Sequence, residues 1–125
     1  MTINRNTDAL MIGSQGAGNL GTYTMSGGTV SVPNGPTIVG HQNTAIGRLT
    51  LSGTADFATK LLTIGNAAGT NGRVEVSGSA QLHVNGLMRV GNSGTGRLKI
   101  TGDGAVIDCD GYWQNSLSTL ELDIN

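Results

Sequence analysis

The sequence has few of the residues that build most cores and reactive sites. One of its 125 residues is a cysteine, Cys109, so neither an internal disulfide framework nor a cysteine-based zinc cluster can form. Aromatic residues make up 3% of the chain and charged residues 12%, which excludes a core built around large rings. Stability therefore has to come from aliphatic packing and backbone hydrogen bonds.

Charge and long apolar runs are also lacking. The formal net charge is −1 and the seven basic residues are dispersed, so nucleic acid is not an expected partner. No apolar run approaches the ~20 residues of a membrane-spanning helix, so no membrane span is expected. The first residues lack the apolar segment of a secretory signal. Either the chain is not exported by that route, or it is a mature or excised fragment.

Glycine is abundant, with 21 copies, and its positions reveal a repeat. A hydroxyl residue followed by glycine closes four similar tetrads, whose glycines are Gly27, Gly53, Gly78 and Gly102. An apolar residue followed by glycine recurs with the same period, at Gly13, Gly40, Gly65 and Gly91. Two independent markers with one period, roughly 25 residues, indicate an internal repeat.

Each copy carries an alternating pattern between its markers. In the first strand of a copy apolar and polar residues alternate, as where Val74 and Val76 flank Glu75. This alternation places the apolar side chains on one face of a strand. Two further apolar pieces follow in each copy, for example 82–84 and 88–90. No window shows helical spacing, so we expect only strands and turns.

A unit of two or three short strands with one apolar face cannot bury that face alone, so the copies must stack. We predict an all-β chain whose residues 1–125 form one domain. It is a single-chain β-solenoid of the parallel β-helix kind, with about four coils of about 24–27 residues and the last coil incomplete. Both sets of marker glycines are predicted corners, because glycine reaches positive φ without steric cost.

Two runs resemble a known kind of repeat. They are Ile64 to Gly78, IGNAAGTNGRVEVSG, and Val90 to Leu98, VGNSGTGRL. Both are similar to the glycine-rich strand repeats of autotransporters and of long surface proteins that carry a PEP-CTERM sorting signal, and the ending Tyr112 to Leu122 is similar to the segment that follows such arrays. The resemblance implies a right-handed β-solenoid from an exported, envelope-associated or filamentous protein, located outside the cell or on its surface. It specifies architecture rather than activity.

Motifs for catalysis and cofactor binding are weak. The run Gly16 to Gly21 satisfies the dinucleotide pattern G-x-G-x-x-G, but it lies in a turn of the repeat and precedes a strand rather than a helix. No serine is paired with a base in a recognisable order, and the acids carry no paired-carboxylate signature. We predict no catalytic residues and no cofactor, and we expect that the chain is not an enzyme.

Two sets of residues are candidate metal ligands. Asp103, Asp108 and Asp110 could hold calcium near the last glycines, but the EF-hand spacing is absent, so we interpret them as solvated acids. His41 and His83 are far apart in the chain, and His83 has no cysteine or acidic partner at ligand spacing. No metal site is predicted.

Arg48, Arg73 and Arg97 share one repeat position, so they should stack at intervals of about 4.8 Å. In one interpretation their stems cover the edge of the core while their heads bond turn carbonyls. In the other, this Arg face contacts an acidic glycan or a neighbouring subunit. An ice-binding face is not expected, because Glu75 interrupts the outward threonine column that includes Thr50.

The C-terminal stretch 117–125 is predicted to be a capping or partner-pairing strand. Its apolar residues alternate with acids and are Leu117, Leu120, Leu122 and Ile124. An exposed strand edge without a cap pairs readily with another chain. Our leading interpretation is a non-enzymatic structural or adhesive module that self-associates into an extracellular fibre or oligomer. The alternative is a carbohydrate-binding or virion tail-fibre module that uses the Arg face, with a surface glycan as its partner.

Overall fold

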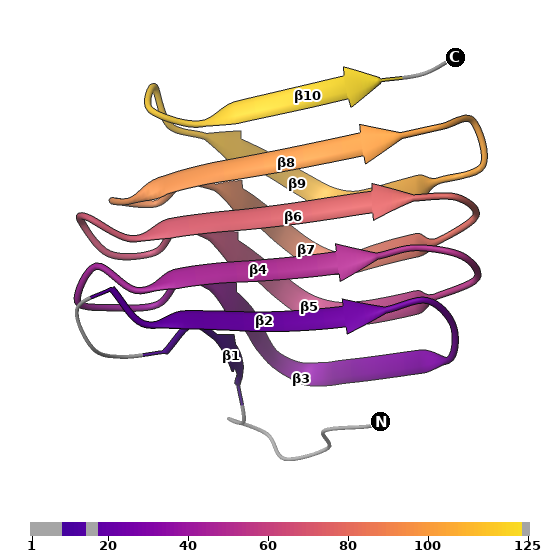
Figure 1. Ribbon diagram of the computed structural model, residues 1–125, viewed down its shortest axis with the longest axis horizontal. Helices are drawn as coiled ribbons and strands as arrows, with labels where there is room; N and C mark the ends of the chain where they lie inside the picture. Colours follow the sequence, from indigo (N-terminus) through magenta and orange to yellow (C-terminus); the bar gives the residue numbers. More distant parts are fainter. Residues whose placement is uncertain (1–8, 15–17, 124–125) are drawn as a thin grey trace.

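A computed structural model describes residues 9–14 and 18–123, and within them the chain forms ten β-strands and no helix (Figure 1). The strands are β1 (Leu10–Ile12), β2 (Leu20–Met25), β3 (Thr29–Val39), β4 (Ile46–Leu51), β5 (Asp56–Ile64), β6 (Asn71–Ser77), β7 (Gln81–Val90), β8 (Thr95–Thr101), β9 (Val106–Gln114) and β10 (Thr119–Asp123). These residues therefore contain no helix of the length and hydropathy needed to cross a bilayer.

The strands alternate between two parallel sheets that share one stacking axis. One sheet has the order β1-β3-β5-β7-β9, and the other, which we call the flat sheet, has the order β10-β8-β6-β4-β2. In Figure 1 the flat sheet runs from left to right in front, and the chain returns behind it while rising towards the C-terminus, so the winding is right-handed. The predicted β-solenoid of about four stacked coils is confirmed.

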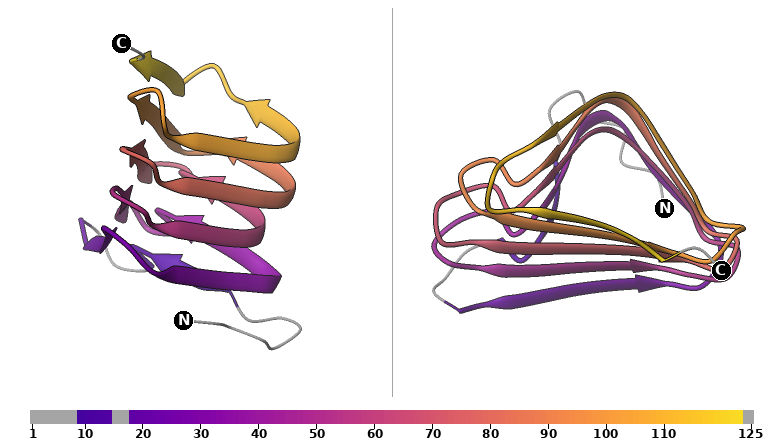
Figure 2. Two further views of the ribbon diagram at one scale, coloured as in Figure 1. Left: turned by 90° about the vertical axis from the view of Figure 1, so that its right-hand side faces the viewer. Right: turned by 90° about the horizontal axis from the view of Figure 1, so that it is seen from above.

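The second and third apolar pieces of each copy are joined in one long, bent strand. The ladder of this second sheet, the bent sheet, shifts register between Val32 and Pro36, and at the matching place in β5 and β7. An irregularity of this kind bends a strand. Each coil is therefore triangular when viewed from above (Figure 2), with one side from the flat sheet and two from the bent strand.

The inward positions follow the predicted alternation and form one aliphatic core. Leu49, Leu51, Val74 and Val76 of the flat sheet are fully buried. Opposite them lie inward residues of the bent sheet, among them Phe57. The core also holds polar groups at the bend. The Thr37 hydroxyl donates to Thr59 Oγ1 at 2.9 Å, and Thr59 donates in turn to the Leu61 carbonyl at 3.0 Å. A buried hydroxyl needs such a partner.

The predicted corner glycines have the left-handed backbone with one exception. Positive φ, from 58° to 89°, occurs at Gly13, Gly40, Gly53, Gly65, Gly78, Gly91 and Gly102. At the first corner the positive φ belongs to Gly28 rather than Gly27. Two adjacent glycines occur only at this corner, so the left-handed residue can shift by one position without a steric penalty.

A third column of glycines lies at the second residue of β4, β6 and β8. These glycines do not have a positive φ, so backbone conformation does not explain why glycine is needed there. Gly47, Gly72 and Gly96 pair in register and point inward. A Cβ at Gly72 would stand 2.2 Å from the Val39 carbonyl oxygen and 2.5 Å from the Gly65 nitrogen. Those two atoms form an intercoil hydrogen bond of 2.7 Å. These glycines therefore allow each corner to be hydrogen-bonded to the coil below.

Candidate functional site

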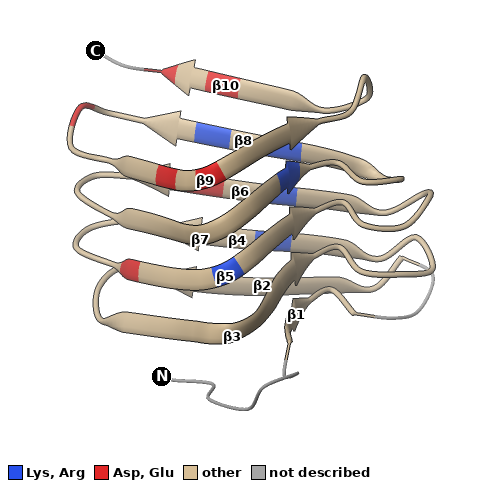
Figure 3. Cartoon of the chain, turned by 180° about the vertical axis from the view of Figure 1, so that it is seen from behind, with Lys and Arg blue, Asp and Glu red and all other residues tan. Residues whose placement is uncertain are grey.

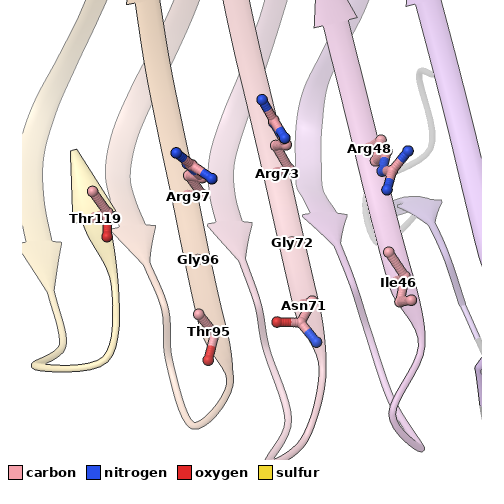
Figure 4. Close-up of a pocket in the computed structure, with 9 residues that line it drawn as sticks. All are labelled: Ile46, Arg48, Asn71, Gly72, Arg73, Thr95, Gly96, Arg97 and Thr119. Carbon is pink, nitrogen blue, oxygen red and sulfur yellow. The ribbon is translucent and has the colours of Figure 1, made fainter. Parts of the chain in front are cut away.

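The three arginines form the predicted column on the outer surface of the flat sheet. Arg48 pairs in register with Arg73, and Arg73 with Arg97 (Figure 4). Each follows one of the inward glycines at 47, 72 and 96, and alternation along the strand then turns the next side chain outward. The position of each inward glycine at its corner therefore determines the position of the outward arginine that follows it. Thr22 and Thr119 continue it at its two ends.

A shallow groove of about 440 Å³ runs beside this Arg column (Figure 4). Its lining contains three arginines and neutral residues only: Ile46, Arg48, Asn71, Gly72, Arg73, Thr95, Gly96, Arg97 and Thr119. A second hollow, of about 360 Å³, includes Glu75 in its lining. The first groove is therefore the more electropositive of the two.

Acidic residues of the adjacent outward column neutralise part of this charge. Arg73 is bonded to Glu75 in its own strand. Arg97 donates to Glu121 at 3.1 Å, and Lys99 Nζ lies 3.7 Å from the same carboxylate. The hydrogen bond from Arg97, followed by the charge of Lys99, lowers the pKa of Glu121 below its ordinary value. Two arginine heads thus bond carboxylates instead of the turn carbonyls of the first interpretation.

Arg48 is the exception in the column. It has no ion pair or hydrogen bond to any residue within 9–14 and 18–123, and it contributes to both hollows. The Nε of Arg73 is buried and also lacks a partner among these residues. Arg48, at the N-terminal end of the groove, is thus the arginine of the column that is free to meet an acidic ligand.

The C-terminal end of the solenoid exposes core positions. Leu120 and Leu122 of β10 pair with Leu98 and Ile100, which places them in the inward columns. They are 41% and 59% exposed, whereas Leu98 one coil earlier is 1% exposed. Leu117, in the turn before β10, is also exposed. Ile124 lies outside the described residues.

The edges of β9 and β10 are open at the same end. β9 pairs only with β7, and β10 only with β8, within the part of the chain that the structure describes. On one side of both strands, backbone N–H and C=O groups therefore have no neighbouring strand. Such an edge is a template for pairing with another chain.

The candidate metal ligands have a different arrangement from the predicted one. His83 Nδ1 lies 2.6 Å from Asp108 Oδ2, and its Nε2 lies 3.0 Å from Gln81 Oε1 and 3.7 Å from Asp56 Oδ1. No acid stands at ligand spacing from His83 in the sequence, but stacking brings acids to it from the coils on either side. No group of three or more His, Cys, Asp or Glu side chains suited to a metal ion occurs in the described ranges.

The remaining candidates lie in ordinary parts of the repeat. The run Gly16 to Gly21 falls partly outside the described residues, and its last residues lead into strand β2 rather than a helix. Asp103 lies in the turn between β8 and β9, and Asp110 is exposed on β9. Thr24, Thr50 and Glu75 form one outward column, as expected.

Contacts between coils could have been found by adding the repeat period to each residue number. His83 and Asp108 are one period apart and pair in register, and so do Arg89 and Trp113. The second pair contributes to a hollow that no sequence motif marks, lined by Leu87, Arg89, Asn92, Tyr112 and Trp113. Sequence motifs miss such pairs because each partner belongs to a different copy.

The fold defines the class of this chain as a right-handed β-solenoid repeat protein. No protein-family model, no curated protein and no solved structure matches it.

Proposed function

We propose that the chain is a non-enzymatic structural module that self-associates through its C-terminal end into an extracellular fibre or oligomer. The observation that carries this proposal is the pair of inward leucines, Leu120 and Leu122, exposed on an edge strand. In the interior coils the same columns are closed by the next coil. A second copy that adds its strands at this end supplies the missing coil.

The energies indicate what such an interface requires. Burying the rest of a leucine side chain contributes at most about 1.5–3 kcal/mol. Bringing two chains together costs roughly 4–15 kcal/mol, so two leucines alone are insufficient. The open edges of β9 and β10 must be hydrogen-bonded as well. Association in which the C-terminal end of one copy meets the N-terminal end of the next is heterologous and produces rings or open filaments.

Size-exclusion chromatography over a concentration series, followed by electron microscopy, tests the proposal. We expect oligomers that grow with concentration. Leu122→Asp should shift the chain to monomer, because a carboxylate in the shared core is costly to bury. Leu61→Asp is the matched control, since Leu61 is also exposed but lies on the bent sheet away from that end. A wild-type chain that stays strictly monomeric at high concentration refutes self-association.

The Arg column supports a second candidate function. The groove lined by Arg48, Arg73 and Arg97 contains no carboxylate, and Arg48 is free to bind an anion. A carbohydrate-binding or virion tail-fibre module would use this face for an acidic surface glycan, because guanidinium groups bind carboxylate and sulfate in paired hydrogen bonds. Glycan-array binding that is lost in Arg48→Ala and Arg73→Ala supports this candidate, and binding that persists in both variants excludes it.

A further inference from the structure

A second groove lies on the outer surface of the bent sheet, away from the Arg column. Two hollows, of about 440 and 240 Å³, share Leu87 and Arg89 and so form one continuous surface across several coils. The second hollow is lined by Pro36, Ile38, Leu61, Thr63, Asn66, Leu87 and Arg89. In register, Thr63, Arg89 and Trp113 form one outward column along this surface. We call this surface the Trp groove.

Two exposed aromatic rings line the Trp groove although aromatic residues are scarce in the chain: Trp113 faces outward, and Tyr112 continues the inward column of Met88 at the uncovered end. There are one tryptophan, two tyrosines and one phenylalanine. Phe57 is buried in the core, whereas Trp113 and Tyr112 are 45% and 43% exposed and line the same hollow. Trp113 is outward-facing, so it makes no contribution to the core. An exposed indole offers a flat face on which a ligand ring can stack.

Arg89 is the sole charged residue in the lining of the Trp groove. It has no ion pair or hydrogen bond with any of the residues that the structure describes. The acidic residues of the bent sheet lie elsewhere, in the first half of β9 and at the start of β5 (Figure 3). The lining also contains neutral polar groups, among them the Asn92 side chain. Asn92 Nδ2 donates a hydrogen bond to Asn66 Oδ1 at 3.2 Å. Asn92 Oδ1 accepts no hydrogen bond from any residue that the structure describes.

We propose that the Trp groove binds an oligosaccharide that contains uronic acid residues. The apolar C–H face of a pyranose ring stacks on Trp113, and its carboxylate accepts paired hydrogen bonds from the Arg89 guanidinium. Asn92 Oδ1 accepts a hydrogen bond from a ring hydroxyl. The groove continues over Thr63 and Leu61, so it can hold further sugar residues along the stacking axis.

Other ligand classes fit these groups less well. A wholly apolar ligand would leave the side-chain amides and the guanidinium without partners. A nucleotide brings a phosphate group with up to two negative charges to a lining with one cation. A sugar acid has one negative charge for each carboxylate, an apolar ring face and hydroxyl edges, which match the lining group by group.

Tryptophan fluorescence reports on this site directly, because Trp113 is the only tryptophan in the chain. The full chain is titrated with a trigalacturonate and, in parallel, with the same trisaccharide methyl-esterified at every carboxyl group. We expect a saturable change in Trp113 emission with the acid, and at least about ten-fold weaker binding of the ester, since the charge-assisted bonds are lost. Arg89→Gln should weaken binding of the acid by a similar factor.

Arg48→Gln is the matched control, because it removes one equally unpaired arginine from the opposite surface and should leave the titration unchanged. The proposal is overturned if no saturable change occurs up to about 1 mM acid. It is equally overturned if acid and ester bind alike, if Arg48→Gln abolishes binding while Arg89→Gln does not, or if a nucleoside monophosphate binds more tightly than the sugar acid. Because Trp113 lies on the edge strand β9, the titration is carried out at a protein concentration at which size-exclusion chromatography shows one species, so that its outcome is separate from self-association.

Discussion

Substitution of Gly72 by alanine should destabilise the protein more than the same substitution at Gly69, which lies in a solvent-exposed turn of the same coil. The added methyl group would stand 2.2 Å from the Val39 carbonyl oxygen and 2.5 Å from the Gly65 nitrogen. Both atoms are backbone, and they bond to each other at 2.7 Å, so neither can move aside alone. The methyl group therefore separates a buried donor and acceptor.

The expected magnitude follows from that geometry. Overpacking of a rigid site costs about 1–3 kcal/mol, and leaving a buried backbone group without its partner adds about 1–3 kcal/mol. We expect Gly72→Ala to lower the free energy of unfolding by about 2–6 kcal/mol, with a central value of about 4 kcal/mol. Since Gly72 has no positive φ, backbone strain makes no contribution to this loss.

Gly69→Ala is the control in the same coil. Gly69 has a φ of 82°, so alanine there incurs a left-handed backbone cost of about 1–2 kcal/mol. The new methyl group meets the Thr44 Cγ2 methyl at 3.0 Å, at the end of a side chain that can rotate. Urea unfolding followed by far-UV circular dichroism gives both free energies. If Gly69→Ala costs as much as Gly72→Ala, the role assigned to the inward glycines is refuted.

Three further outcomes are expected. Thr59→Val should lower the free energy of unfolding by about 1–3 kcal/mol, because it leaves the buried Thr37 hydroxyl without an acceptor. The Thr37→Val/Thr59→Val double variant should cost less than the sum of the two single changes. A double-mutant cycle measures this difference, and strict additivity would show that the two hydroxyls are not coupled. Thr44→Gly should raise the free energy of unfolding by about 1 kcal/mol, because Thr44 has a φ of 59°, which is unfavourable for a β-branched residue. A decrease in thermal stability would argue against backbone strain at this position. Burial first, and then the charges of Asp108 and Asp110, raise the pKa of the Cys109 thiol above its ordinary value. In the alkaline range the folded thiol therefore stays protonated at a pH where the unfolded thiol ionises. The free energy of unfolding thus falls as the pH rises through the pKa of the unfolded thiol. Iodoacetamide should thus label Cys109 more slowly in the native protein than in urea at the same pH, and Asp110→Asn should speed native labelling; equal native and urea rates would contradict the raised pKa.

The alternation of apolar residues was enough to predict which side chains face the core. Val74 and Val76 are buried and Arg73 points outward, as the pattern required. Period-two alternation depends only on one strand and its two faces, so it can be read from a single copy. The stacking of Arg48 on Arg73 followed from the repeat period by the same simple geometry.

The bend and the contacts between coils could not be derived in that way. Whether the apolar pieces at 82–84 and 88–90 form two strands or one bent strand depends on a register shift, which hydropathy does not report. The role of Gly72 was missed because its clash is with backbone atoms of other segments, Val39 and Gly65. The Asp108 contact of His83 was missed because proximity across coils matters there, rather than spacing within a motif.

Hydrogen–deuterium exchange at low and high protein concentration tests the central claim, association through the C-terminal end, most directly. We predict that amides of β9 and β10 gain protection as the concentration rises, because their open edges become hydrogen-bonded to a second copy. Amides of β6, which already pairs with strands on both sides, should not change. Exchange in β9 and β10 that is independent of concentration, or new protection confined to the flat sheet around the Arg column, would contradict the account.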